Sequence, residues 1–339
     1  MMPQQSPDVS PELFWDTMTA YQRSAALKTA VDLKVFTHIA EGNSTAAAVA
    51  AAAGAAERGV RILCDSLTVI GFLNKSGSNY SLTDSTAAFL DTRSPMYLGT
   101  AIDFIFSPQQ RRGFDDLTNA VKNGGSSVTG DASMDPESEM WVTFARAMSP
   151  LMFPTAKAVA EHVGLDQEKP IKVLDIAAGH GIYGIMVGQK YPSAQIYGAD
   201  WNNVLAVAKE NAEKFGIGDR YHTIPGSAFE SDFGTGYDVI LVPNFLHHFD
   251  AATCESFIRK LGAALAEGGT ILTVEFVPND DRVTPQQSAM FPLVMLAATP
   301  AGDAYTFAEL KEMFENCGFA HNEIIELHPM PQHLIVSTR

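Results

Sequence analysis

The chain is 339 residues long and 46% hydrophobic, which allows two domains with a sizeable core. Asp and Glu outnumber Lys and Arg by 39 to 23, a formal net charge of −16, and so acidic a surface disfavours nucleic acids and anionic membranes as partners. The three cysteines lie far apart without a C-x-x-C pair, so they indicate neither a disulfide framework nor a zinc site.

The N-terminal residues lack the basic and apolar regions of a signal peptide. No apolar run reaches membrane length. We therefore expect a cytoplasmic protein.

Residues 1–98 are predicted to form a helical domain that ends in a hairpin. Pro11 begins the first helix, and a second helix covers residues 23–33. Ser44 suits the N-cap of an alanine-rich helix, and the next helix ends near Gly71. Residues 72–82 then read as two short strands around a polar turn. Helices followed by such a hairpin indicate a winged helix.

A winged helix allows a second interpretation, a transcription regulator. Up to residue 98, however, nine Asp and Glu face seven Lys and Arg, and the hairpin carries a single Lys. This is no basic footprint for DNA. The composition favours a protein-interaction role for this domain.

Residues 99–165 are predicted to be a helical linker, with a Gly/Ser loop at residues 124–134. Trp141, Phe144, Met148 and Met152 recur at spacings of three and four, which places them on one helix face. Plain core packing explains such a face. A face packed at a domain junction can also wall a pocket, so both interpretations can hold.

The region from residue 166 to 339 begins with a nucleoside-binding pattern. Residues 171–176 form an apolar run typical of a buried parallel strand, with Asp175 near its end. Small residues then lead through Gly179 and Gly181 into a helix, whose N-terminal amides face the same crevice. A second strand ends at Asp200, and an acid in that position can accept hydrogen bonds from ribose hydroxyls.

The choice of nucleoside rests on Asp175. Gly179, Gly181 and Gly184 match the dinucleotide fingerprint G-x-G-x-x-G, which alone is a weak signal. A carboxylate just before the turn would repel a pyrophosphate, whereas it suits the ammonium and sulfonium of S-adenosylmethionine (SAM). The pattern D-x-A-x-G-x-G followed by Asp200 resembles the first two motifs of class I SAM-dependent methyltransferases. An ordinary α/β turn that binds nothing is the alternative.

The rest of the chain alternates strands and helices. Strands are expected at residues 221–224, 238–242 and 271–276, and Asp250 is expected to cap a helix. Two adjacent strands at 320–326 and 333–338 imply an antiparallel pair at the sheet edge. The predicted fold class is therefore α/β, a Rossmann-like seven-stranded SAM-methyltransferase sheet behind an N-terminal winged-helix domain. A dinucleotide dehydrogenase would need a further catalytic domain, for which no residues remain.

Four segments resemble the plant-type small-molecule O-methyltransferases, whose bacterial relatives methylate polyketide and phenolic products. They are residues 57–63, 80–83, 144–149 and 244–249, and the likeness covers nearly the whole chain. The resemblance implies SAM as cofactor, an apolar or aromatic small-molecule acceptor, and a homodimer through residues 1–98. It implies His247 as the catalytic base and Glu275 as an acid beside it. The implied cofactor contacts are Asp175, Ala177, Gly179, Gly181, Asp200, Trp201, Ser227, Ala228, Phe229 and Asn244. The implied substrate-pocket residues are Trp141, Phe144, Met148, Met152, Phe291 and Met295, with Phe153 and Met290 in the same segments.

The sequence departs from this family in places that bear on the chemistry. Ala177 and Ala178 stand where glycines are usual, and Ser227 stands where an Asp reads the adenine side. The second acid beside the histidine falls on Ala304, although Asp303 is adjacent. The missing acid leaves a C- or N-methyltransferase on the same scaffold open.

The chemistry expected of His247 is proton removal. A phenol has a pKa near ~10, so a neighbouring histidine can take its proton as the methyl group moves. His248 is the alternative base. A metal site using both histidines is disfavoured, because neighbours on a turn point apart and no third ligand is evident.

Overall fold

The computed structural model describes residues 10–126, 138–166 and 169–339. Two compact units divide the chain after Ile102. The predicted Gly/Ser loop at 124–134 lies mostly outside the described residues. No helix in the described part of the chain is both long and apolar enough to cross a membrane.

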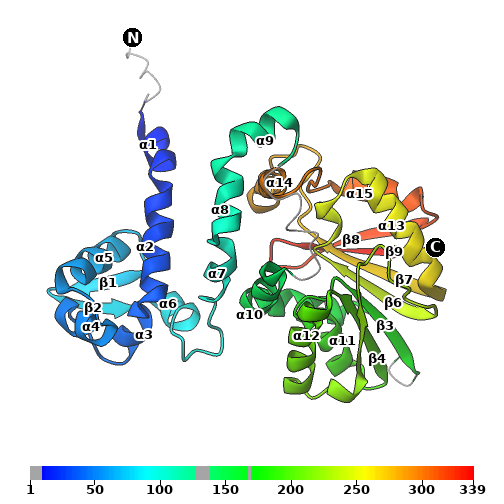
Figure 1. Cartoon of the computed structure of the whole chain (residues 1–339), viewed down its shortest axis with the longest axis horizontal. Coiled ribbons are helices and arrows are strands. Elements are labelled where there is room, and N and C mark those ends of the chain that lie inside the picture. The colour runs from blue at the N-terminus through cyan, green and yellow to red at the C-terminus, as the bar shows by residue number, and fades with distance from the viewer. Residues whose placement is uncertain (1–9, 127–137, 167–168) are drawn as a thin grey trace, which may run out of the picture. The chain divides into compact units, whose positions relative to one another are not determined.

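The first unit has the predicted order of helices followed by a hairpin (Figure 1). Thr45, not the predicted Ser44, caps the alanine-rich helix, because its hydroxyl accepts a hydrogen bond from the Ala48 amide at 3.2 Å. The Ser44 hydroxyl donates instead to Asn79 in the hairpin, at 3.0 Å. The elements are α1 (Glu12–Met18), α2 (Ala20–Asp32), α3 (Val35–Ala40), α4 (Ala46–Ala53), α5 (Glu57–Val69), β1 (Leu73–Ser76), β2 (Asn79–Leu82) and α6 (Asp84–Phe89).

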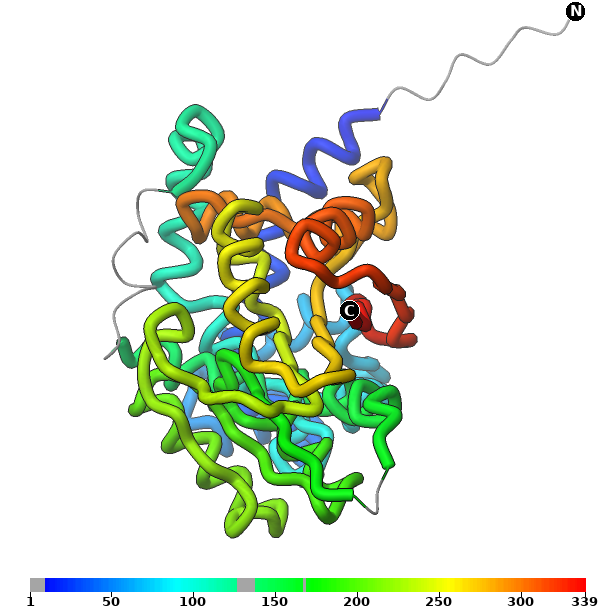
Figure 2. The backbone as a smooth tube through the Cα atoms, turned by 90° about the vertical axis from the view of Figure 1, so that its right-hand side faces the viewer, coloured from blue at the N-terminus to red at the C-terminus, as the bar shows by residue number. Residues whose placement is uncertain are grey.

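A seven-stranded sheet organises the second unit, in the order β5-β4-β3-β6-β7-β9-β8. All neighbouring pairs are parallel except those of β9, which runs antiparallel to both β7 and β8. Figure 2 traces the backbone of this unit by colour, from green near β3 to red at the C-terminus. The strands are β3 (Ile171–Ile176), β4 (Ala194–Asp200), β5 (Tyr221–Pro225), β6 (Tyr237–Pro243), β7 (Leu265–Glu275), β8 (His321–Glu326) and β9 (His333–Thr338).

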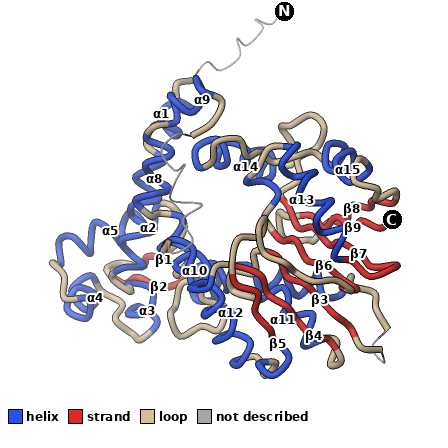
Figure 3. The backbone as a smooth tube through the Cα atoms, turned by 45° about the vertical axis from the view of Figure 1, so that its right-hand side comes forward, coloured by secondary structure: helices blue, strands red, loops and turns tan. Residues whose placement is uncertain are grey.

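Helices cover both faces of this sheet (Figures 1 and 3). The long helix α10 (Glu139–Glu161) contains Pro150 and Pro154 and packs against α11 (Ile182–Lys190) and α12 (Asn202–Lys214). On the other face α13 (Ala251–Ala264) packs against α15 (Phe307–Glu315). The remaining helices are α7 (Ala101–Ile105), α8 (Pro108–Asp115), α9 (Leu117–Asn123) and α14 (Gln286–Ala298), with short 3-10 turns η1 (Gly218–Arg220) and η2 (Leu246–His248).

The strand order reverses between β3 and β6, since the chain builds outward first to β5 and then to the other side. In open α/β sheets, ligands bind outside the carboxyl ends of the strands at such a switch point. The turn after β3 and the turn after β6 therefore define where a site is expected. The strand β3 is buried along its length, as its apolar sequence predicts.

Candidate functional site

The turn after β3 has the conformation that its small residues predict. Ala177, Gly179 and Gly181 all have positive φ, at 48°, 57° and 74°. A side chain on Gly181 would place its Cβ 2.9 Å from the Tyr221 hydroxyl, so only glycine fits there. The Ala178 amide donates to the Ala199 carbonyl at 3.1 Å, which ties the turn to β4. The alanine that replaces a usual glycine at 177 is thus accommodated in a left-handed conformation.

Asp200 lies at the end of β4 and joins this turn. One carboxylate oxygen accepts the Gly179 amide at 2.8 Å, and the other accepts the Trp201 amide at 2.7 Å. Burial raises the pKa of Asp200 to about 6, although the two amides lower it. Each carboxylate oxygen has a further lone pair. The two parts of the predicted nucleoside site are therefore in direct contact, and the acid can still accept hydrogen bonds from ribose hydroxyls.

Asp175 lies beneath the turn, with its side chain directed at α11. Its Oδ2 accepts the Gly184 amide at 2.9 Å, and its Oδ1 is buried without a partner among the described residues. Burial raises the pKa of Asp175 to about 8, and the nearby Asp200 adds to the rise. Its direct contact with the cofactor stays a prediction.

The loop after β5 carries three of the predicted cofactor contacts, Ser227, Ala228 and Phe229, of which Ser227 was predicted on the adenine side. The Ser227 hydroxyl accepts the Phe229 amide at 3.2 Å, within the loop itself. Lys260 of α13 donates from its Nζ to the carbonyls of Ala228, Phe229 and Ser231 at 2.8–2.9 Å. We did not predict Lys260 from the sequence. The sequence feature that could have indicated it is a lysine among the apolar residues of α13, because a charged group that is partly buried must form hydrogen bonds there.

His247 and Glu275 form the pair that the sequence predicts. His247 lies in η2 after β6, Glu275 ends β7, and both side chains are buried. The His247 Nδ1 is 2.5 Å from Glu275 Oε2, while Glu275 Oε1 accepts the amides of Phe245 and Leu246 at 3.1 and 2.9 Å. A carboxylate on Nδ1 assigns the proton to that nitrogen and leaves Nε2 as an acceptor.

Comparisons with known proteins identify the family of the chain. A family model for the O-methyltransferase domain matches residues 115–320, and one for the O-methyltransferase dimerisation domain matches residues 15–92. The chain belongs to the O-methyltransferase family. Its cofactor is SAM, and the small residues of the turn and the further lone pairs of Asp200 are compatible with a nucleoside. The second match supports the protein-interaction interpretation of the N-terminal domain.

Individual relatives resemble the methyltransferase over most of their length. A 3-hydroxy-5-methyl-1-naphthoate 3-O-methyltransferase from Streptomyces sahachiroi is 25% identical, covering 91% of this chain and 89% of the relative. The SAM-dependent methyl transferase PigF from a Serratia strain is 24% identical, covering 95% and 94%. A crystal structure of a proposed O-methyltransferase from Nostoc punctiforme is 51% identical with a TM-score of 0.93, covering 98% and 99%.

His248 differs from its neighbour in its contacts. Its ring lies 4.5 Å from the His247 ring and 6.0 Å from the Trp141 ring, measured between centroids. Burial, and secondarily the adjacent His247, holds the pKa of His248 well below its usual range. The described residues contain no group of three or more His, Cys, Asp and Glu that could hold a metal ion.

Asp303, the candidate substitute for the acid that is absent at Ala304, has partners other than His247. Its carboxylate pairs with Arg282 at 3.6 Å and accepts the Ala304 amide at 2.8 Å. Gly302, next to it, approaches the backbone of His247: a Cβ there would lie 2.3 Å from the His247 carbonyl oxygen. Among the described residues, Glu275 is therefore the one acid in contact with the His247 ring.

Aromatic side chains from α10 and α14 adjoin the turns. Phe144 lies 3.9 Å from the position a Cβ on Gly179 would take. Phe291 meets the His247 ring edge-on, with centroids 4.9 Å apart, and stacks on Phe276 at 4.0 Å. Met148, Met152 and Met295 are buried in the same two helices, and the Trp141 ring lies beside the rings of Phe144 and His248, with centroids 5.9 and 6.0 Å apart.

Two further residues of these segments lie elsewhere. Phe153 stacks on Phe215 at the end of α12, with centroids 6.0 Å apart. Met290 is exposed on α14. Neither the stacking of Phe153 nor the exposure of Met290 indicates a place in the substrate pocket.

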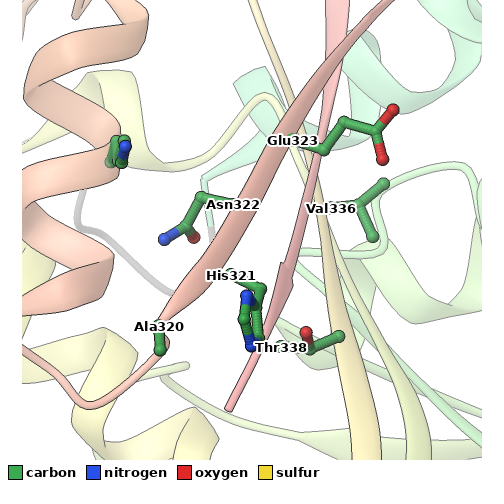
Figure 4. Close-up of a pocket in the computed structure, with 7 residues that line it drawn as sticks. Ala320, His321, Asn322, Glu323, Val336 and Thr338 are labelled. Atoms are coloured by element: carbon green, nitrogen blue, oxygen red, sulfur yellow. The ribbon is translucent and has the colours of Figure 1, made fainter.

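A surface pocket of about 300 Å³ lies at the other end of the sheet, and Figure 4 shows its lining. It includes His321, where β8 begins, and Thr338, where β9 ends. Because β9 runs antiparallel to β7, this is the edge opposite to Glu275 and His247. The pocket is therefore separate from the site.

Proposed function

We propose that this O-methyltransferase transfers the SAM methyl group to a hydroxyl of an aromatic small molecule, with His247 as the general base. The observation that carries the proposal is the buried contact between His247 Nδ1 and Glu275, which leaves Nε2 to accept a proton. Cofactor identity rests on the family, and the role of each residue rests on its contacts.

The proposed methyl transfer uses SAM as the methyl donor and the side chains of His247 and Glu275 for the proton. Bound SAM supplies an electrophilic methyl group on a sulfonium. His247 Nε2 takes the proton of the acceptor hydroxyl as its oxygen forms a bond to the methyl carbon and the carbon–sulfur bond breaks. Glu275 holds the imidazole through Nδ1 and stabilises the imidazolium that forms. The proton then passes to solvent, leaving a methyl ether and S-adenosylhomocysteine.

The buried surroundings support an aromatic acceptor. Phe291 and Phe276 form a stacked pair beside the base, and Phe144 lies at the glycine turn. Apolar walls exclude water, and opposite charges cancel when phenolate meets sulfonium, so a dry pocket favours the transition state. A relative that acts on a hydroxynaphthoate supports the same acceptor class.

The test is His247→Ala assayed beside the exposed control His328→Ala. Removing the base should lower turnover about 10²- to 10⁴-fold. Calorimetry should show unchanged affinity for S-adenosylhomocysteine, because the imidazole faces the acceptor. His248→Ala should act mainly on stability. Near-normal turnover of His247→Ala would instead favour an ionised oxygen, an amine or an activated carbon as acceptor, and so the C- or N-methyltransferase.

A further inference from the structure

Polar hydrogens from three separate segments converge on one sulfur atom near the base. The Tyr183 hydroxyl is 3.8 Å from Met152 Sδ, Gln332 Nε2 is 3.9 Å from it, and Asn244 Nδ2 is 4.0 Å from it. The Thr155 hydroxyl lies 3.4 Å from Gln332 Oε1, which turns the amide nitrogen toward the sulfur. A thioether is a weak acceptor.

These donors are poorly satisfied for groups so deeply buried. Tyr183 is 2% exposed and Gln332 is 4% exposed. The Asn244 amide also reaches Tyr183 Oη at 3.4 Å, but its Oδ1 is buried without a partner among the described residues. Asn244 has a left-handed backbone as well, with φ of 52°. Buried polar groups left short of partners, combined with strain, are typical of functional sites.

The cluster lies between the cofactor turn and the base. Asn244 follows β6, and Tyr183 is in the first turn of α11. Gln332 precedes His333, which pairs with Glu275 at the end of β7. Burial raises the pKa of Tyr183, and the charge of Glu275 raises it further, so the hydroxyl lies near that acid. All three donors are therefore at the carboxyl edge of the sheet, where ligands bind.

We propose that Tyr183, Asn244 and Gln332 form a subsite for a second oxygen of the acceptor, a neutral carbonyl or hydroxyl. This oxygen displaces the Met152 thioether, which is long and adaptable enough to move aside. No cation belongs to the cluster, and the charge of nearby Glu275 disfavours an anion, so a carboxylate does not suit it. The inference rests on the proposed function and narrows its substrate class to oxygenated aromatics.

The experiment measures acceptor binding to the complex with S-adenosylhomocysteine. The probes are a set of regioisomeric acetylnaphthols and the matching ethylnaphthols, which lack the carbonyl. The wild type should bind at least one acetylnaphthol about tenfold more tightly than its ethyl counterpart, the effect of one to two buried hydrogen bonds. Tyr183→Phe and Gln332→Leu should abolish that preference and leave the ethylnaphthol affinity within about twofold.

Tyr191→Phe is the matched control, since Tyr191 is a buried tyrosine at the far end of the same helix. It should retain the preference. The urea midpoint of Tyr183→Phe should not fall below that of the control, because the Tyr183 hydroxyl has only two weak contacts, to the Met152 sulfur at 3.8 Å and from the Asn244 amide at 3.4 Å.

Each other outcome has a definite meaning. A wild type that does not bind S-adenosylhomocysteine contradicts the proposed function itself. Cofactor binding without a preference for any acetylnaphthol, or with no binding of either probe set, overturns the subsite alone. A loss of S-adenosylhomocysteine affinity in Tyr183→Phe would assign the donors to the cofactor. A lower urea midpoint would make the hydroxyl structural.

Discussion

Burying the carboxyl of Asp175, near the end of β3, costs free energy of folding that the small residues of the adjacent turn do not cost. It is completely buried, and one of its oxygens has no partner among the described residues. Burial penalises the charged form and raises the pKa of Asp175 to about 8, far above that of an exposed aspartate. The folded protein therefore holds a proton on this carboxyl over a pH range in which the unfolded chain has released it.

The direction of the resulting pH effect follows from that proton. Between about pH 4 and pH 8 the folded state binds more protons at Asp175 than the unfolded state, so this group makes stability fall as pH rises. Asp175→Asn should flatten that fall, since an amide does not titrate and its oxygen can still accept the Gly184 amide. Urea unfolding of both proteins at pH 5 and pH 8 measures the difference. A steeper decline in the variant would contradict the argument.

Some site residues could be predicted from the sequence, and others could not. Asp200 and Glu275 were predictable, because motif spacing and strand ends place acids at known points. Tyr183 and Gln332 were not, since their meeting depends on segments about 150 residues apart that only the folded sheet brings together. Asp303 illustrates the reverse case. Its position beside Ala304 suggested a substitute acid, but Arg282 pairs with it.

Elements were predicted more accurately than contacts. The strand β3 was placed at its observed bounds, since a strand buried on both faces leaves a continuous apolar run. The cap of α13 at Asp250 is confirmed by its contact with the Thr253 amide at 2.9 Å. Ser44 was the wrong cap because two adjacent hydroxyl residues satisfy the same pattern, and only backbone geometry chooses Thr45.

The loop after β5 depends on one side chain of α13. Lys260 donates to three of its carbonyls, and its Nζ lies 4.4 Å from the centroid of the Phe233 ring. Lys260→Met should free these carbonyls and loosen the predicted adenine side. We expect the dissociation constant of S-adenosylhomocysteine to rise about tenfold, the loss of one to two charge-assisted bonds.

The turnover number at saturating SAM separates this effect from general damage. It should stay near the wild-type value in Lys260→Met, because His247, the proposed base, lies on another turn. Lys260→Arg should restore part of the affinity, since a guanidinium also donates to several carbonyls. Exposed Lys311→Met is the control. Unchanged affinity in Lys260→Met would show that the loop holds its shape without the lysine.

At the scale of the whole molecule, α1 and the start of α2 display an apolar surface. Leu13 is 80% exposed, and Phe14, Trp15, Met18 and Tyr21 are each more than half exposed. Monomers rarely leave such contiguous apolar area in water. A dimerisation-domain match at residues 15–92 includes part of this surface. We therefore expect a homodimer that buries α1.

The double variant Leu13→Glu with Trp15→Glu should dissociate the dimer, because charges placed in an apolar interface are costly to desolvate. Light scattering after gel filtration gives the mass. Val283→Glu is the control, since Val283 is similarly exposed but lies in the other unit. A monomeric wild type at working concentration would contradict the prediction.

The position of β9 within the sheet has a consequence for biosynthesis. β9 is made after both of its neighbours, yet it lies between β7 and β8 and pairs His333 with Glu275. Until residues 333–338 have been made and folded, β8 has no strand to join, and Glu275 lacks its neighbour in β9. A chain without β9 therefore holds the turn after β3 but not the strand that pairs beside the contact between His247 and Glu275.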